Sequence, residues 1–361
     1  MLKRSLHFPD TSRTRSPVAL VVAGVVLIAA TYGMARFGVG LLHPQMAAVR
    51  PGLDGALSPA GTAQFSSYCL AVLVAGRLVR TRARAVVLAA GLSAGVGALG
   101  LMLAHTPLTF TAAAFVAGAG AGLASPALVP VLDRAVPARR SGLTQAAVNS
   151  GTAVGLIAVG AVVLITRAVA TPWLLVALVC VGAGLAVHAL APREPASDAS
   201  PAAAGPPPGT PRTSRLPMTL PWLLAAATGV VSAYVWTYGP SVVVQDTGLD
   251  TGRIGWLWVT VGVGGLLGVL TSRLVELTSP ARAFLLCAVG LLLATAAVAL
   301  TAQLWVAVLG LALFGAAYMA LSGTLILWGR VLRPEDGGQA TAWLFLALAV
   351  GQALGAALLS P

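Results

Sequence analysis

Charged residues are scarce in this sequence, and their scarcity excludes a soluble globular protein of this size. Lys, Arg, Asp and Glu together make up 9% of the 361 residues, whereas a soluble domain carries roughly 25% because its surface faces water. Hydrophobic residues make up 58%, and the mean hydropathy is +0.90. The polar groups needed to cover a water-facing surface are missing, so we expect most of the chain to face lipid.

The patterns of metal sites, disulfide frameworks and phosphate-binding loops are also missing. The three cysteines, Cys69, Cys180 and Cys287, lie in three different apolar runs without the spacing of a metal site or a disulfide framework. We interpret them as small apolar packing residues. The sequence has no Gly-Lys-Ser/Thr loop, which excludes ATP-driven transport by this chain itself. We therefore expect no metal and no cofactor.

Acidic residues are absent from the middle of every long apolar run, although the chain has ten of them. Proton-coupled transporters often carry the proton on a buried carboxylate. The titratable groups that remain are His43, His105 and Asp133, each close to the end of a run. Histidine can titrate near neutral pH, but at a helix end it is more often an interfacial polar residue. These residues alone do not establish proton coupling.

What the sequence does have is a series of apolar runs long enough to cross a membrane. About 20 mainly apolar residues span a bilayer, and backbone groups in lipid must be hydrogen-bonded within the segment, which favours helices. The first run, 17–46, is longer than the apolar core of a signal peptide, about 7–15 residues. We predict an all-α membrane protein with about eleven transmembrane helices, at 18–43, 59–79, 85–105, 108–132, 142–165, 172–191, 219–243, 254–272, 282–301, 304–328 and 338–359.

The basic residues predict the orientation of these helices. If the N-terminus is inside, 18 of the 22 Lys and Arg residues fall on the inside, and only Arg50, Arg167 and Arg253 fall on the outside. Cytoplasmic loops carry such an excess, so we predict a cytoplasmic N-terminus. The net charge of +12 does not indicate a nucleic-acid partner, because the charges form short clusters between apolar runs.

One segment between the runs differs from its surroundings and divides the chain. Residues 192–218 are rich in Pro, Ala and Ser and cannot bury a core, so we predict a disordered cytoplasmic linker. The predicted organisation is a cytoplasmic tail at 1–16, a six-helix bundle at 17–191, this linker, and a bundle of five helices at 219–361.

The two halves also carry similar packing patterns. The pair Gly151 and Gly155 in the fifth predicted helix and the pair Gly351 and Gly355 in the eleventh have the small-xxx-small spacing that allows close helix contact. Two similar halves joined by a cytoplasmic linker are typical of transporters built from parallel repeats.

Local stretches add a resemblance to a known family. Gly118-Ala-Gly-Ala-Gly122 is similar to the glycine-rich fourth helix of the major facilitator superfamily, and Gly76-Arg-Leu-Val-Arg-Thr-Arg-Ala-Arg84 is similar to its basic loop between helices two and three. With the two-half layout, the chain resembles that superfamily over essentially its whole length. Tyr32-Gly-Met-Ala-Arg36-Phe-Gly, followed by Leu41-Leu-His-Pro44, resembles the YbfB/YjiJ-type branch.

The resemblance implies a secondary active transporter that moves a small solute across the cytoplasmic (inner) membrane by alternating access. It favours efflux, makes proton coupling plausible, and implies a monomer in contact with membrane lipids and with no nucleic acid. It also assigns gating of the inside face to the loop residues Arg77, Arg80, Arg82 and Arg84.

The sequence departs from the family pattern in three places. The acidic residue usual in the basic loop is missing. Position 114 is Ala, where many proton-coupled relatives carry Arg. The apolar runs predict eleven helices, so the twelfth helix of the family pattern is not expected.

Polar residues within the predicted helices are the candidates for substrate binding. Arg36 is the only Arg or Lys that lies away from the ends of a predicted helix, at a cost of about 2.5–3.5 kcal/mol if it lies at the centre. We interpret it as an anchor for an anionic or polar substrate; the alternative is an Arg that reaches the outer headgroups. Other polar positions recur at helical spacing and should face neighbouring helices or a cavity; ordinary interhelical hydrogen bonding is the alternative for each. The candidate substrate-binding residues are Arg36, Tyr32, Gln64, Tyr68, Gln145, Asn149, Tyr234, Tyr238 and Tyr318.

Two other classes of function stay open at this point. Gly91-Leu-Ser93-Ala-Gly95 matches the Gly-x-Ser-x-Gly pattern of hydrolases, but that motif needs a strand–turn–helix setting and a triad with an acid and a histidine, so we expect a chance match and no enzyme. A sensor or scaffold that kept the fold and lost transport is the other alternative. A transporter should have a central polar cavity open to solvent, whereas a scaffold should have a collapsed apolar interior.

Overall fold

The structure is a computed structural model that describes residues 16–166, 168–193, 217–333 and 337–359. Within these ranges the chain is helical and contains no strand. Ten of its helical segments are long and apolar enough to cross a membrane. Most of the predicted tail at 1–16 and of the predicted linker at 192–218 lies outside the described residues, so the predicted domain organisation stays a prediction.

Several helices begin at a hydroxyl residue followed by proline. Ser16, Thr106 and Ser279 each accept a hydrogen bond from a backbone N–H three residues ahead, and each precedes a proline at the first helical position. The side-chain oxygen satisfies a backbone donor that the helix leaves free, and proline already has the helical φ and no N–H to lose. These pairs therefore fix where three membrane helices start.

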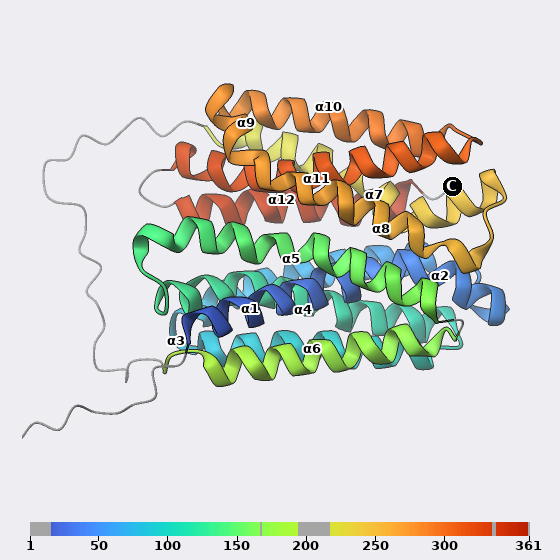
Figure 1. Ribbon diagram of the computed structural model, residues 1–361, viewed down its shortest axis with the longest axis horizontal. Helices are drawn as coiled ribbons and strands as arrows, with labels where there is room; N and C mark the ends of the chain where they lie inside the picture. Colours follow the sequence, from blue (N-terminus) through green and yellow to red (C-terminus); the bar gives the residue numbers. More distant parts are fainter. Residues whose placement is uncertain (1–15, 167, 194–216, 334–336, 360–361) are drawn as a thin grey trace, which may run out of the picture.

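The N-terminal half lies in the lower part of Figure 1, and the C-terminal half lies above it. The N-terminal half consists of α1 (Pro17–Ile28), a π-helical segment η1 (Ala29–Arg36), α2 (Phe37–Val49), the short η2 (Pro51–Leu53), α3 (Leu57–Leu103), α4 (Pro107–Asp133), α5 (Ala138–Ile165) and α6 (Ala170–Leu190). The C-terminal half consists of α7 (Thr219–Thr247), η3 (Thr251–Arg253), α8 (Gly255–Leu266), η4 (Leu267–Leu270), α9 (Thr271–Leu277), α10 (Pro280–Ala299), α11 (Leu304–Leu332) and α12 (Gly337–Leu358).

The segment α3 contains two helices joined at a break. Its 47 residues would be about 70 Å long if straight, and Arg82 within it has a non-helical backbone (φ −136°, ψ 35°). The backbone of Gln64 lies against Gly118 of α4, and Ala94 lies against Gly120, two residues further along. Positions 30 residues apart in α3 thus meet α4 at one level, so the chain folds back at Arg82 and its two arms lie side by side. The count of eleven membrane crossings stays a prediction.

Glycine pairs bring the helices of each half into backbone contact. A side chain at Gly151 or Gly155 of α5 would collide with the backbone of α1 and η1, and one at Gly351 or Gly355 of α12 would collide with the backbone of α7. Both predicted small-xxx-small sites are therefore confirmed as close contacts. The first helix of each half is held by equivalent glycines of its fifth helix.

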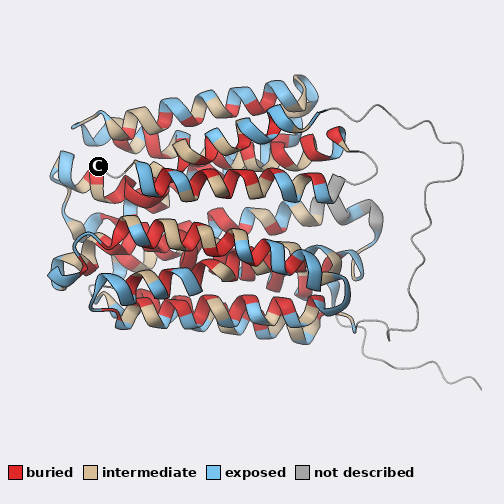
Figure 2. Cartoon of the chain, turned by 180° about the vertical axis from the view of Figure 1, so that it is seen from behind, coloured by how far each residue is buried: buried red, intermediate tan, exposed pale blue. Residues whose placement is uncertain are grey.

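The outer faces of the bundle are apolar. Figure 2 shows exposed residues along the outward sides of the helices and buried ones along the sides that face inward. The exposed residues include many large hydrophobic side chains, for example Leu285, Val289 and Leu293 on α10, each at least half exposed. In water such a surface would aggregate, so it is the surface expected against lipid.

Candidate substrate-binding site

Arg36 lies at the end of the π-helical segment η1, where the first membrane helix leaves regular α-helical geometry. π-helical turns are rare and often occur at functional sites. The segment is held from one side by α5, since a side chain at Gly33 would lie 2.5 Å from the carbonyl oxygen of Thr152. From the other side, the indole N–H of Trp258 on α8 donates to the carbonyl oxygen of Phe37 at 3.2 Å. The Arg36 side chain is fixed in the interior and is only 2% exposed.

Aromatic rings surround the guanidinium group. Its central carbon lies 4.2 Å from the ring centroid of Tyr68, 4.8 Å from that of Phe65, 5.2 Å from that of Phe37 and 5.6 Å from that of Tyr32. The negative face of an aromatic ring attracts a cation by about 0.5–1 kcal/mol, and by more in a dry setting. These rings offset most of the cost of the buried charge but supply no counter-ion.

A glutamine from the opposite half completes the site. Nη2 of Arg36 donates to Oε1 of Gln352 on α12 at 2.8 Å. Nε2 of Gln352 in turn donates to the hydroxyl of Tyr318 at 3.0 Å and to that of Ser232 at 3.3 Å. Gln352 is 1% exposed and Ser232 is fully buried. The chain of hydrogen bonds therefore runs from η1 into α12, α11 and α7.

The positive charge at this site has no carboxylate partner among the residues that the structure describes. The printed sequence places no acidic residue in the middle of a helix, and Nε of Arg36 is buried without a hydrogen-bond acceptor. A charged group left without a counter-ion in lipid is costly. The site thus holds one uncompensated cation, a donor that is free to bind an anion, and a lining of aromatic rings.

The structure brings together four of the nine predicted substrate-binding residues. Tyr32, Tyr68 and Tyr318 join Arg36; the hydroxyl of Tyr32 donates to that of Tyr68 at 3.2 Å, and Tyr318 lies edge-on to Phe37 with ring centroids 6.4 Å apart. The alternative position of Arg36, at the outer headgroups, is excluded by its burial.

Gln64 is buried one helical turn from Tyr68, and neither atom of its side-chain amide has a partner. A buried amide without partners costs about 1–3 kcal/mol per group. A ligand that bonds to it would remove this cost, which keeps Gln64 a candidate for substrate binding.

The remaining candidates are not placed at Arg36 by any contact. Tyr238 donates its hydroxyl to the carbonyl oxygen of Ala356, a contact between α7 and α12, and Tyr234 is half-buried against the Tyr238 ring. Gln145 and Asn149 on α5 are half-buried. Tyr238 therefore serves helix packing within the C-terminal half.

Sequence reasoning missed Gln352, Ser232 and Phe65. The predicted candidates were mostly polar residues that recur at helical spacing, whereas Gln352 stands alone on its helix face between two packing glycines. A signal was present, because a lone glutamine in an apolar run is costly unless it has partners. Phe65 could not be distinguished from a lipid-facing or core residue by sequence.

The site is closed at the end of the molecule that holds Gln45 and Thr251. The Gln45 side chain donates to the carbonyl oxygen of Thr251 at 2.8 Å. The hydroxyl of Ser58 donates to the carbonyl oxygen of Ala356 at 3.1 Å. Gly40 meets the backbone of Trp236. All of these contacts join the two halves. Thr251 follows the end of α7 (Thr219–Thr247), so the contact of Gln45 with Thr251 lies at the end away from the start of α7.

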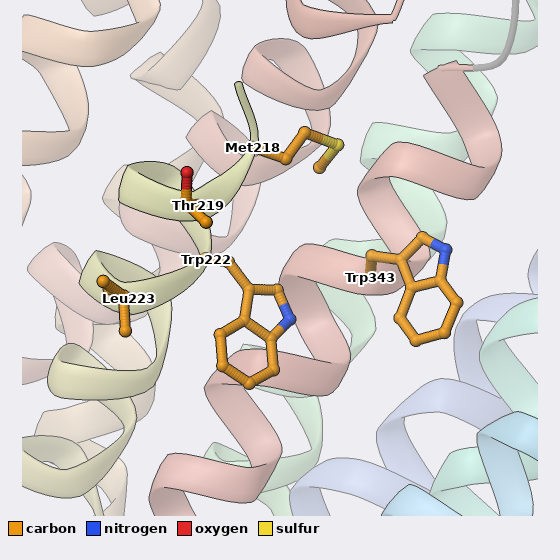
Figure 3. A pocket seen from close by; sticks show the side chains of 5 residues that line it. All are labelled: Met218, Thr219, Trp222, Leu223 and Trp343. Atoms are coloured by element: carbon orange, nitrogen blue, oxygen red, sulfur yellow. The ribbon is translucent and has the colours of Figure 1, made fainter. Parts of the chain in front are cut away.

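A central cavity open to solvent was expected, but among the residues that the structure describes Arg36 and Gln352 are shielded from solvent in this conformation. Arg36 and Gln352 are 2% and 1% exposed, because the rings and the cross-half contacts close over them. A hollow with a volume of about 460 Å³ lies elsewhere, at the start of α7 beside α12. Figure 3 shows that it is lined by Met218, Thr219, Trp222, Leu223 and Trp343, so it is a peripheral apolar groove and not the site.

The predicted gating residues lie around the break in α3. Arg77, Arg80 and Arg82 are exposed. Arg84 donates from Nη2 to the carbonyl oxygen of His188 at 2.9 Å, and the ring Nδ1 of His188 lies 3.0 Å from the carbonyl oxygen of Arg84. Arg84 thus ties the second arm of α3 to the end of α6, within one half of the molecule; its gating role stays a prediction.

The Gly-x-Ser-x-Gly pattern lies in the middle of a helix. The hydroxyl of Ser93 donates to the carbonyl oxygen of Ala90 at 3.2 Å. A side chain at Gly91 would meet the backbone of Cys180 and Gly184 on α6, and one at Gly95 would meet Val181. Helix packing explains these glycines, and the strand–turn–helix setting of a hydrolase motif is not present here.

An all-helical membrane protein with two halves and a buried polar site between them has the architecture of a secondary transporter. Comparison with known families agrees: residues 18–356 match the Major Facilitator Superfamily. The chain therefore belongs to the major facilitator superfamily, and the fold predicted from the sequence is confirmed. No curated protein matches the sequence.

Solved structures of transporters share this fold. A point-mutant form of the nucleoside transporter NupG aligns with a TM-score of 0.71 at 10% identity, covering 94% of this chain and 90% of that one. The D-xylose-proton symporter aligns with a TM-score of 0.66 at 17% identity, covering 94% and 88%. The human organic anion transporter MFSD10 (TETRAN) aligns with a TM-score of 0.64 at 15% identity, covering 96% and 93%. At these identities the likeness shows the fold alone.

Proposed function

We propose that the protein is a secondary transporter that moves a small anionic solute across the membrane by alternating access, and that Arg36 binds the anion. The observation that carries this proposal is the position of Arg36: it is buried between the two halves, and no carboxylate pairs with it in the described part of the chain. An anion that binds there would supply the missing counter-charge. One of the structural neighbours is described as an organic anion transporter, which fits this substrate class.

The closed end suggests how access alternates. With the N-terminus in the cytoplasm, as the basic residues predict, the end that holds Gln45 and Thr251 faces outward. We propose that breaking the contacts of Gln45 with Thr251 and of Ser58 with Ala356 opens the site to the outside. The protein would act as a monomer in the cytoplasmic (inner) membrane, and the resemblance to a superfamily layout shared by many exporters favours efflux.

Proton coupling is the least supported part of the expected function. The helices provide no mid-span carboxylate, and His43 is 8% exposed with its Nε2 placed 3.2 Å from the carbonyl oxygen of Leu53. A proton carrier would have to be a group other than a buried carboxylate. If transport still depends on a pH gradient after His43 is replaced, a group other than His43 must carry the proton.

Transport into proteoliposomes tests the proposed function. Labelled carboxylates, neutral sugars and organic cations would be compared in vesicles with the protein and in protein-free vesicles. We expect uptake of anionic solutes only, and loss of that uptake in Arg36→Lys, because the compact ammonium group lacks the planar fork of donors. The exposed Arg253 provides the control, Arg253→Gln, which should transport normally. Uptake of cations or sugars that is indifferent to Arg36 would refute the proposal.

A further inference from the structure

Gln352 fills half of a two-donor edge on Arg36. Nη2 donates to the amide oxygen at 2.8 Å, whereas Nε, on the same edge of the planar guanidinium group, is buried with no partner. A carboxylate presents two oxygens that match this edge and accept two parallel hydrogen bonds. One amide oxygen cannot do so, which explains why the second donor is left over.

We propose that Gln352 holds, in the ligand-free protein, the place of a substrate carboxylate. The inference rests on the proposed function, in that the site must bind an anion. A monocarboxylate displaces the amide oxygen and binds both Nε and Nη2. Its single negative charge matches the single positive charge of the site, since the helices supply no other mid-span charge.

Displacement of Gln352 changes the contact between the halves. The amide nitrogen of Gln352 is held by Tyr318 on α11 and Ser232 on α7, both in the C-terminal half. The side chain therefore stays with its own half when the carboxylate displaces its oxygen, and the hydrogen bond between Arg36 and Gln352 across the interface is lost. Binding of the substrate thus loosens the closed end, and the empty carrier is held closed by Gln352.

A cross-linking experiment without ligand tests the holding role of Gln352. Gln45→Cys and Thr251→Cys, in a protein with the three native cysteines replaced by alanine, report closure of that end through a short bifunctional thiol reagent, because the two residues are in contact there. Loss of one hydrogen bond to a charged group predicts a fall of about tenfold in the ratio of closed to open protein in Gln352→Ala.

Two further variants keep this test decisive. Gln352→Asn has an amide that is one methylene shorter, so it should show the same fall in cross-linking as is expected of Gln352→Ala. It replaces the alanine variant in the test if alanine impairs folding. Gln352→Glu provides a permanent carboxylate for Arg36 and should be at least as closed as the wild type. The matched control is Gln339→Glu, which adds the same charge at an exposed position of α12 and should leave cross-linking unchanged. Unchanged cross-linking in both Gln352→Ala and Gln352→Asn would overturn the inference.

Binding of carboxylates forms the second arm. Benzoate and lactate serve as an aromatic and a hydroxylated monocarboxylate, and both should lower cross-linking in the wild type. Both should bind about tenfold more tightly to Gln352→Ala, because the competing amide is gone. Neither should bind Gln352→Glu, because its own carboxylate occupies Arg36. Binding to Gln352→Glu at wild-type strength would overturn the inference.

If cross-linking responds to Gln352 while no carboxylate binds the wild type, the holding role stands and both the proposed function and the carboxylate exchange fail. If carboxylates bind and cross-linking ignores Gln352, the function stands and the inference fails.

Discussion

Replacing Arg36 by glutamine separates a binding role from a structural one. The substitution removes the charge and keeps a hydrogen-bond donor toward Gln352. A charge at a helix centre costs about 2.5–3.5 kcal/mol on insertion scales, and the four rings around Arg36 return about 0.5–1 kcal/mol each. The two contributions nearly cancel, so Arg36→Gln should change the free energy of unfolding by no more than about 1 kcal/mol.

The effect on anion binding should be much larger than the effect on stability. Hydrogen bonds to a charged group contribute about 1.5–3 kcal/mol each, so the loss of one to two such bonds should weaken carboxylate binding by at least tenfold. Thermal unfolding of the detergent-purified protein, with and without carboxylates, measures both quantities in one assay. A loss of 3 kcal/mol or more in stability, the size expected when a needed partner of a buried polar network is removed, would refute the reasoning and make Arg36 a structural residue.

Two further predictions concern packing around the site. Gly155→Ala should destabilise the protein by about 1–3 kcal/mol because its methyl group would collide with the backbone of Ala29. Gly182→Ala, whose methyl group would contact no other helix, should be neutral or slightly stabilising in the same unfolding assay. Tyr238→Phe should cost about 1 kcal/mol through the lost hydrogen bond to Ala356 and leave carboxylate affinity unchanged; a large loss of affinity would place Tyr238 in the binding site.

The fold was predictable because its main signals are local. Helix length, helix starts such as Thr106-Pro107, and the small-xxx-small pairs are properties of short segments, and lipid leaves the backbone few alternatives to a helix. The unusual cost of Arg36 in an apolar run marked the site for the same reason. The partner of Arg36 was not predictable, since Gln352 is 316 positions away and their contact depends on how the two halves pack.

The π-helical geometry of η1 illustrates the same limit. Nothing in the residues Ala29–Arg36 requires a π-helix, and glycine at position 33 only permits a close approach. The wider helix is stabilised by contacts from outside it, namely the carbonyl of Thr152 against Gly33 and the indole of Trp258 that donates to Phe37. Such tertiary contacts override local preference, and they aim Arg36 at the opposite half.

The polar centre argues for transport over a scaffold that merely kept the fold. A scaffold gains nothing from Arg36 and Gln352, because well-packed apolar residues in place of buried ionic or polar partners are often neutral or stabilising. Here the interior instead holds an unpaired cation with a free Nε and a glutamine, Gln64, with an unsatisfied amide. These unsatisfied groups are enclosed between two halves that meet at one end through a few polar contacts. They lower the stability of the protein unless a ligand forms the missing hydrogen bonds. A site that is costly when empty and satisfied when occupied is the arrangement a carrier needs, because the free energy released on binding is then available to move the halves.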